Sequence, residues 1–370
     1  MKDDILEWLT RLIACDSQNP PREISANGSL LGTVRDALGD SFQFSVNDFG
    51  RGRVNLLARR GSPRTLFNVH LDTVPIGETD QWTKPPLSAT VSDGRVFGRG
   101  ACDIKGAAAC LIAAARNSKD DVAILFSTDE EGAESCCIDQ FVASPECQTF
   151  QEFVICEPTK CHATIGHRGY LSVAMEFSGQ TGHTSQHAML SQSANHRAID
   201  WTQEMLQRLS QFQAEQLSDQ NCCFNVGTIS GGIKNNVIAD RCQVTWSARL
   251  PGGYTNQQLL DFCFPKSSQG DDRFGWRVTF DGAPLPGNSQ QMQLAEAFCK
   301  HLDLSIGPQV DFWTEAAIFA QTGKPTIVLG PGDIQQAHAA DEWVSVSQLE
   351  QCATIYQRLM SDTASMGAEK

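Results

Sequence analysis

Short apolar strands that run into acidic or histidine residues recur along this chain, and they constrain its fold more than any other feature. Buried β-strands are predicted over residues 65–71 (TLFNVHL), 122–126 (VAILF), 153–155 (FVI) and 325–329 (PTIVL). An alanine-rich helix is predicted over 105–116, between the first two strands. Strands that alternate with helices are typical of an α/β domain whose mostly parallel mixed sheet is covered on both faces.

The middle of the chain follows a different pattern, in which strands alternate apolar and polar residues and a long helix is polar. These elements are predicted over residues 171–177, 241–250 and 276–280 for the strands, and about 194–213 for the helix. Such a group predicts a small α+β domain inserted into the larger one. We therefore expect a catalytic domain built from 1–165 and 282–370, and an inserted domain over 166–281.

The charge of the chain restricts its partners. The formal net charge is −14, whereas binding to nucleic acid or to an anionic membrane surface requires clustered lysine and arginine. We therefore expect neither of these partners. A small substrate remains compatible, because it needs only one or two local cations.

The N-terminus predicts an amphipathic helix and no export signal. Asp3, Asp4 and Glu7 interrupt any apolar core of a signal peptide. The longest apolar stretch, over 106–115, is far shorter than a membrane span. The cysteines are scattered without a CxxC pair, which is typical of reduced thiols. These features favour a cytoplasmic protein.

Acidic and histidine residues lie at or just beyond the ends of the predicted strands. They are His70 and Asp72, Asp103 after a Gly-Arg-Gly turn, Glu130 and Glu131, Glu157, and His338. His70 and Asp72 are two residues apart on one predicted strand, so both side chains point to the same side. In an open α/β sheet, ligands bind beyond the carboxyl ends of the strands. We therefore expect these residues to converge on one pocket.

The chemistry of this set points to divalent metal ions. Two imidazoles and several carboxylates suit zinc, cobalt or manganese. Asp103 can bridge two ions, and Asp72 can hold His70 from behind and fix its tautomer. A spare carboxylate can take a proton from water whose pKa the ions lower towards about 7. The pattern predicts a metal-dependent hydrolase.

Six motifs together resemble one family, the co-catalytic zinc deacylases and peptidases. The motifs are HLDTVP (70–75), GRGACDIKG (98–106), STDEEG (127–132), CEPT (156–159), GHTS (182–185) and GPGDIQQAH (330–338). The family includes acetylornithine deacetylases, succinyl-diaminopimelate desuccinylases, aminoacylases and carboxypeptidases. Residues 314–316 (TEA) resemble the acetylornithine deacetylase branch. NPPREI (19–24), LFNVHLDTVP and VDFWTEAAIF resemble the acetylcitrulline deacetylases within it.

The resemblance implies two sets of zinc ligands that share one residue. These sets are His70, Asp103 and Glu157 for one ion, and Asp103, Glu131 and His338 for the other. Glu130 would be the general base, with Asp72 as the partner of His70. Cobalt could replace zinc.

The resemblance also implies that the inserted domain is a lid and dimerisation domain. His183 would reach the active site of the partner subunit of a homodimer, and Asn236 and Arg249 would grip the substrate carboxylate. From the residues alone, His183 could instead be a turn histidine, and Arg249 could pair with a local carboxylate.

These inferences predict hydrolysis of an N-acetyl amino acid of arginine biosynthesis, either N-acetylornithine or N-acetylcitrulline. A desuccinylase of diaminopimelate precursors or a dipeptidase or carboxypeptidase is an alternative within the family. An inactive amino-acid-binding homologue is an alternative of another class. It predicts the loss of a ligand or of the base, and all of these positions are intact.

Overall fold

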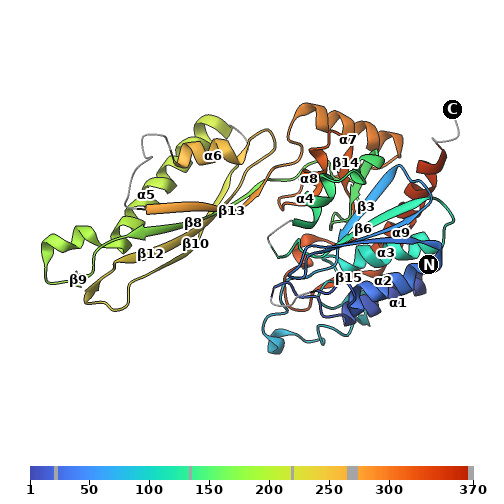
Figure 1. Cartoon of the computed structure of the whole chain (residues 1–370), viewed down its shortest axis with the longest axis horizontal. Helices are drawn as coiled ribbons and strands as arrows, with labels where there is room; N and C mark the ends of the chain where they lie inside the picture. Colours follow the sequence, from blue (N-terminus) through green and yellow to red (C-terminus); the bar gives the residue numbers. More distant parts are fainter. Residues whose placement is uncertain (21–23, 133–135, 218–220, 265–273, 366–370) are drawn as a thin grey trace. The chain divides into compact units, whose positions relative to one another are not determined.

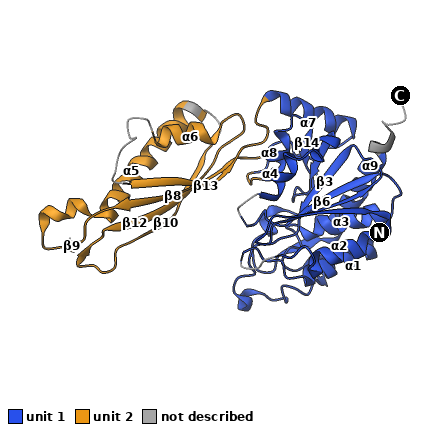
Figure 2. Cartoon of the chain, in the orientation of Figure 1, with its two compact units in different colours: residues 1–166, 289–310, 314–370 blue, residues 167–288, 311–313 orange. Residues whose placement is uncertain are grey.

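The computed structural model describes residues 1–20, 24–132, 136–217, 221–264 and 274–365. Part of the NPPREI motif, residues 21–23, therefore lies outside the described residues. The chain divides into two compact units (Figure 2). Unit 1 comprises residues 1–166, 289–310 and 314–370, and unit 2 comprises 167–288 and 311–313.

Unit 1 is built on a mixed sheet of six strands in the order β1-β2-β6-β3-β7-β14 (Figure 1). The strands are β1 (Gln43–Asp48), β2 (Val54–Arg60), β3 (Thr65–His70), β6 (Val122–Ser127), β7 (Glu152–Ile155) and β14 (Thr326–Val328). The four strands β6, β3, β7 and β14 are parallel, whereas β2 runs antiparallel to both β1 and β6. The prediction of an α/β domain with a mostly parallel mixed sheet is confirmed.

Helices cover both faces of this sheet. They are α1 (Lys2–Ala14), α2 (Ser29–Leu38), α3 (Lys105–Arg116), α4 (Cys136–Val142), α7 (Ser289–His301), α8 (Ala316–Ala320) and α9 (Val346–Ser365). Helix α3 has the predicted bounds, and its small alanine side chains let it pack closely against α1, α9 and β3. The rings of Phe67 and Tyr356 meet edge to face at 5.7 Å, and the Tyr356 hydroxyl donates to the carbonyl of Leu329 at 2.6 Å.

A second sheet in unit 1 joins segments that are far apart in the sequence. It contains β4 (Thr90–Ser92), β5 (Arg95–Phe97) and β15 (Trp343–Ser345) in the order β15-β5-β4. Both pairs of strands are antiparallel. This sheet was not predicted. The turn after β5 leads to Asp103. Because β5 pairs with β15, this turn lies next to the segment that follows His338.

Unit 2 is an antiparallel sheet in the order β10-β12-β8-β13. The strands are β8 (Tyr170–Ser178), β10 (Cys223–Gly231), β12 (Arg241–Arg249) and β13 (Phe274–Gly282), with α5 (Ala194–Phe212) and α6 (Asn256–Cys263) packed on them. A short ribbon pairs β9 (Gly182–His183) with β11 (Val237–Ile238). Strand β10 was not predicted, because a Gly and several polar residues interrupt its apolar alternation.

The bounds of unit 2 differ from the inserted domain expected over 166–281. Residues 282–288 belong to unit 2, because His167 and Leu285 exchange backbone hydrogen bonds of 2.8 and 3.0 Å. Residues 311–313 also belong to it, since the Trp313 ring packs edge to face on Phe280 at 5.0 Å. Throughout the described part of the chain, every helix is too short or too polar to cross a membrane.

Candidate metal centre

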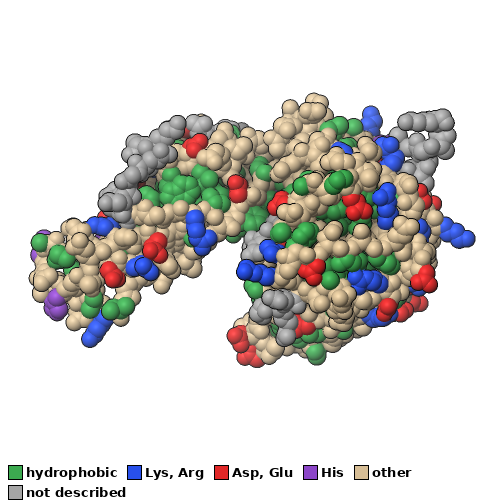
Figure 3. Space-filling view, in the orientation of Figure 1, with side chains coloured by type: hydrophobic (Ala, Val, Ile, Leu, Met, Phe, Trp, Pro, Cys, Tyr) green, Lys and Arg blue, Asp and Glu red, His purple; other side chains and the backbone are tan. Residues whose placement is uncertain are grey.

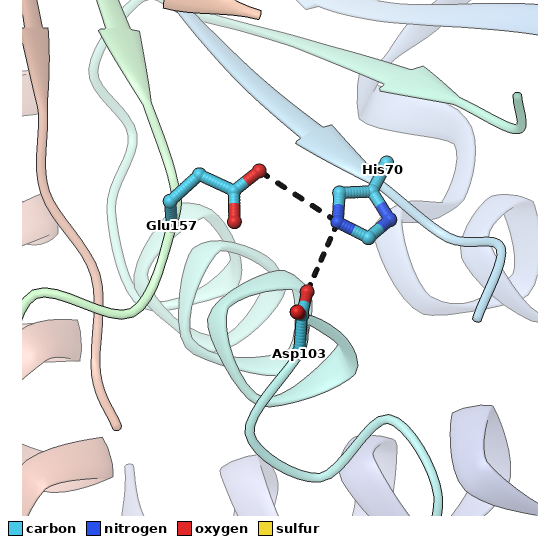
Figure 4. Close-up of side chains that lie close together, drawn as sticks. All are labelled: His70, Asp103 and Glu157. Carbon is cyan, nitrogen blue, oxygen red and sulfur yellow. Dashed lines mark hydrogen bonds and ion pairs between the residues drawn. The ribbon is translucent and has the colours of Figure 1, made fainter. Parts of the chain in front are cut away.

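The first group of candidate ligands gathers at the carboxyl ends of β3 and β7. His70 is the last residue of β3, Glu157 follows β7, and Asp103 precedes α3. Nε2 of His70 lies 3.1 Å from Oδ1 of Asp103 and 3.7 Å from Oε1 of Glu157. Figure 4 shows the three side chains pointing towards one another. All three are buried.

A second group shares Asp103 with the first. Nε2 of His338 lies 3.2 Å from Oδ2 of Asp103 and 3.0 Å from Oε1 of Glu131. Asp103 therefore directs one carboxylate oxygen to each histidine. The His338 side chain is 50% exposed, and its backbone is in the left-handed region with a φ of 58°. Non-glycine residues in this region are uncommon and often occur at functional sites.

These two groups have the composition of two metal sites. In each group, the three donor atoms lie within 4.8 Å of one another. Among the described residues, the carboxylates of Asp103, Glu131 and Glu157 form ion pairs with the imidazoles of His70 and His338 alone. Carboxylates crowded in a buried position need cations, and oxygen and imidazole donors suit zinc-type ions. The residues present thus fit a pair of divalent ions.

The electrostatics of the two histidines reflect this excess of negative charge. The interactions with Asp103 and Glu131 raise the pKa of His338 to about 11. Burial by itself lowers the pKa of His70, but the interactions with Asp103 and Asp72 raise it well above its usual range. Burial would raise the pKa of Asp103, but the two histidines hold it well below its usual range. Both imidazoles therefore bind a proton strongly wherever no stronger cation competes for these carboxylates.

Asp72 lies just beyond β3, because the strand ends at His70 rather than including Asp72 as expected. It nevertheless remains next to His70, with Oδ1 3.4 Å from Nδ1 of the ring. Its other oxygen accepts hydrogen bonds from the backbone N–H of Glu131 at 3.0 Å and from Nδ2 of Asn19 at 3.4 Å. Asp72 is fully buried, and its backbone carbonyl lies within hydrogen-bond distance of Nδ1 of His70, at 3.0 Å.

Glu130 and Glu131 lie three and four residues beyond β6, which ends at Ser127. The side chain of Glu130 is half-buried. Burial raises the pKa of Glu130 well above its usual range, and His70 opposes this shift. A carboxyl group tuned upwards in this way beside a metal site is suited to proton transfer near neutral pH.

Two buried glutamates near the site were given no role from the sequence. Glu342 accepts hydrogen bonds from the loop that carries Asp103. Glu315 accepts from Nδ2 of Asn68 on β3 at 2.7 Å, and burial together with Asp129 raises its pKa to about 8. Glu315 lies in the TEA segment that carries the family resemblance, and Glu342 lies four residues after the GPGDIQQAH motif.

His183, expected to act in catalysis, and Asn236 and Arg249, expected to bind substrate, all lie in unit 2, in two separate places. The ribbon of β9 and β11 brings the segments of His183 and Asn236 together: Val237 pairs with His183, and the backbone N–H of Thr184 donates to the carbonyl of Asn236. Both side chains are exposed. Histidine side chains are visible at the surface of unit 2 beside β9 (Figure 3).

Arg249 lies at the opposite end of β12 from this ribbon, because only residues 239 and 240 separate β11 from the first residue of β12. A nine-residue strand is roughly 25–30 Å long. Within one unit 2, Arg249 is therefore not brought together with His183 and Asn236. The Arg249 guanidinium stacks over the ring of Tyr170 at 4.5 Å.

Comparison with known proteins gives the family. Residues 66–362 match the model of peptidase family M20/M25/M40. The chain is 38% identical to the N-acetyl-L-citrulline deacetylase of Xanthomonas campestris pv. campestris, over 96% of this chain and 97% of that protein.

Solved structures share the fold at low sequence identity. A tripeptidase from Staphylococcus aureus superposes with a TM-score of 0.72 at 16% identity, covering 99% of both chains. The aminopeptidase PepT of Bacillus cereus superposes with a TM-score of 0.71 at 16% identity, covering 98% of this chain and 99% of that one. The chain thus belongs to peptidase family M20/M25/M40, in the branch of the acetylornithine and acetylcitrulline deacetylases.

Proposed function

We propose that this protein hydrolyses the amide bond of an N-acetyl amino acid of arginine biosynthesis and releases acetate and the free amino acid. The observation that carries the proposal is the pair of ligand groups that share Asp103, with Glu130 beside them. N-acetylcitrulline is the first substrate to test, since the curated relative is named for it. N-acetylornithine is the second.

His70, Asp103 and Glu157 would hold one divalent ion, and Asp103, Glu131 and His338 would hold the other, with zinc expected and cobalt as a substitute. The chemistry that such ions supply when bound is polarisation of the amide carbonyl and acidification of water. Asp103 offers a separate oxygen to each group, as a bridging carboxylate requires. Asp72 would keep the His70 ring oriented.

Glu130 is the proton carrier in this proposal. Its carboxylate would take a proton from the attacking water and deliver it to the nitrogen of the departing amine. Burial keeps the pKa of Glu130 above its usual range, which brings its affinity for the proton closer to that of an activated water. A base of this kind contributes a factor of roughly 10²–10⁴ to the rate.

Unit 2 would bind the free carboxylate of the substrate. Arg249 is stacked on Tyr170, and its buried Nη1 has no hydrogen-bond acceptor among the described residues. A guanidinium with free N–H groups binds carboxylates through paired hydrogen bonds. Asn236 lies on the ribbon with His183, at the other end of β12 from Arg249, so it would add an amide contact to the substrate of the partner subunit.

His183 would donate a hydrogen bond to the oxyanion from the partner subunit of a homodimer. Its Nδ1 accepts from the backbone N–H of Ser185 at 3.2 Å, so the neutral ring carries its proton on Nε2. The separation of His183 from Arg249 along β12 supports action on different active sites.

An apolar face of unit 2 supports the homodimer. Ile199 and Leu206 on α5 are 53% and 49% exposed, and Ile229 on the edge strand β10 is 51% exposed. The three side chains line one surface depression together with polar residues of α5. Exposed apolar side chains grouped beside an open strand edge are typical of a protein interface.

The test is acetate release from N-acetylcitrulline and N-acetylornithine by the zinc- or cobalt-loaded protein. A chelator-treated sample and a Glu130→Gln variant serve as controls. We expect metal-dependent release from at least one substrate, and a strong preference identifies which. Release only from succinyl-diaminopimelate or from dipeptides would overturn the proposed substrate class. Metal binding without any hydrolysis would favour an inactive amino-acid-binding protein.

A further inference from the structure

Glu342 lies at the centre of the loop that carries Asp103. Its Oε2 accepts from Nη1 of Arg99 at 2.6 Å and from the backbone N–H of Gly100 at 3.0 Å. Its Oε1 accepts from the backbone N–H groups of Cys102 and Asp103, both at 2.9 Å. Glu342 is buried. One carboxylate thus satisfies three backbone N–H groups in the four residues that end at Asp103.

Arg99 forms hydrogen bonds that link the loop of Asp103 to two further loops. Its Nη1 also donates to the carbonyl of Ala339 at 3.4 Å, and its Nη2 donates to the carbonyl of Pro75 at 3.1 Å. The guanidinium lies 5.1 Å from the centre of the Trp82 ring. Arg99 is buried as well, so its hydrogen bonds are shielded from competing water.

The loops tied together in this way carry residues of both ligand groups. Ala339 follows His338 directly, and Pro75 lies three residues after Asp72. The backbone of Gly98, at the start of the loop, also donates to the carbonyl of Glu342 at 2.9 Å. Gly100 has a φ of 82°, and a Cβ there would lie 2.9 Å from Thr73, so this loop also packs closely on the loop after β3.

We infer that the Arg99–Glu342 pair is the positioning element of the metal centre: it fixes the backbone of Asp103 and holds that loop against those of Asp72 and His338. Neither residue is a candidate ligand itself. The inference rests on the proposed function, because it assigns the pair a role towards metals that Asp103 and His338 would bind. Groups that orient metal ligands typically change metal affinity by a factor of 10–100 when they are altered.

The test is a titration of metal-free protein with cobalt, followed by visible absorption and equilibrium dialysis. Glu342→Gln is the principal variant. A glutamine side chain has one acceptor oxygen where glutamate has two. Its NH₂ group would therefore face two of the four N–H groups that donate to Glu342 in the parent. We expect both cobalt dissociation constants to rise by about 10–100-fold. Thermal unfolding of the same metal-free samples reports whether the variant is folded.

Glu152→Gln is the matched control. Glu152 accepts from the Thr65 hydroxyl at 2.9 Å and pairs with Arg64 at 3.6 Å. It is the first residue of β7, at the end of the sheet opposite the ligands. The control loses the same charge from the same unit, and we expect its cobalt affinities to match those of the parent.

A structural role alone predicts a different result. In that case the melting temperature of Glu342→Gln would fall, while cobalt affinities measured well below melting stayed within threefold of the parent. That result would overturn the inference. If Glu342→Gln does not fold, Arg99→Lys decides by the same criterion, since it keeps the positive charge but loses the forked contacts. A parent protein that binds no cobalt would instead refute the proposed metal centre itself.

Discussion

Asp72 accepts a hydrogen bond from the backbone N–H of Glu131 at 3.0 Å. The other oxygen of the same carboxylate lies 3.4 Å from Nδ1 of His70. His70 and Glu131 belong to different ligand groups. A residue expected only to orient His70 therefore contacts both halves of the candidate centre.

Replacing Asp72 with alanine should therefore weaken both metal sites. Loss of the carboxylate removes the negative charge 3.4 Å from Nδ1 of His70 and the acceptor for the Glu131 N–H. We expect a loss of about 10–100-fold in affinity at each site, measured by calorimetric titration with zinc. If only the affinity of the site that contains His70 changes, the contact with Glu131 has no role in metal binding.

Replacing Glu130 with alanine should separate catalysis from metal binding. The variant keeps all five candidate ligands, so we expect it to bind two equivalents of metal. The turnover number should fall by a factor of roughly 10²–10⁴, because the proton carrier is lost. Steady-state kinetics and metal analysis of the same preparation check both parts. Activity within a few-fold of the parent would show that another group is the base.

Two inactive variants should complement each other if His183 acts across a dimer. We expect His183→Ala and Glu130→Ala each to be nearly inactive alone. After mixing and subunit exchange, a heterodimer would contain one site with both residues intact, so up to a quarter of the sites in a random mixture would regain activity. No recovery in heterodimers verified by differential tags would contradict the role proposed for His183.

A charge on the apolar face of unit 2 should prevent dimer formation. Leu206 is 49% exposed on α5, and Leu206→Glu would bring a carboxylate into the proposed interface at a high desolvation cost. We expect a monomer by sedimentation velocity, with metal binding retained because all candidate ligands are in unit 1. Glu204→Lys, on the same helix, is the control for a surface charge change. A Leu206→Glu protein that remains dimeric would place the interface elsewhere.

Glu315 should make the stability of the metal-free protein decrease with pH. Burial and Asp129 raise its pKa to about 8, from the 4.5 that is usual for a glutamate. Between these values the folded state keeps a proton that the unfolded chain releases, so the free energy of unfolding falls as pH rises. The slope from one such group is at most about 1.4 kcal/mol per pH unit.

The Glu315→Gln variant removes this titration while retaining an acceptor for Asn68. We expect its unfolding free energy, measured by urea denaturation with chelator present, to fall less between pH 5 and 8 than that of the parent. Parallel curves for the two proteins would mean that Glu315 does not titrate in this range.

The sequence predicted the elements whose patterns are local. The apolar runs that became β3, β6 and β7 and the alanine-rich α3 are recognisable without any partner. Strands β5 and β15 are three residues long and pair across most of the chain, so neither carries a local pattern. Strand β10 was not predicted because none of its residues is buried, so its sequence lacks the alternating apolar pattern of a half-buried strand.

In the candidate site, too, the residues at the ends of recognisable strands were predicted, and those that depend on distant contacts were not. His70 and Glu157 lie at or just past strand ends, where the topology alone predicts ligands. The assignment of residues to two ligand groups came from the family resemblance instead. Glu342 and Glu315 resemble ordinary surface acids in the sequence, because their burial depends on contacts with Arg99 and Asn68, which are distant along the chain.

The insertion of unit 2 within unit 1 also sets an order for biosynthesis. A ribosome delivers His70, Asp103 and Glu157 before it begins residue 167, so one ligand group is already present in the nascent chain at that point. His338 emerges only after the whole of unit 2, and Glu342 follows it. The second ligand group and the contact that fixes Asp103 are therefore completed only after the whole of unit 2 has been synthesised.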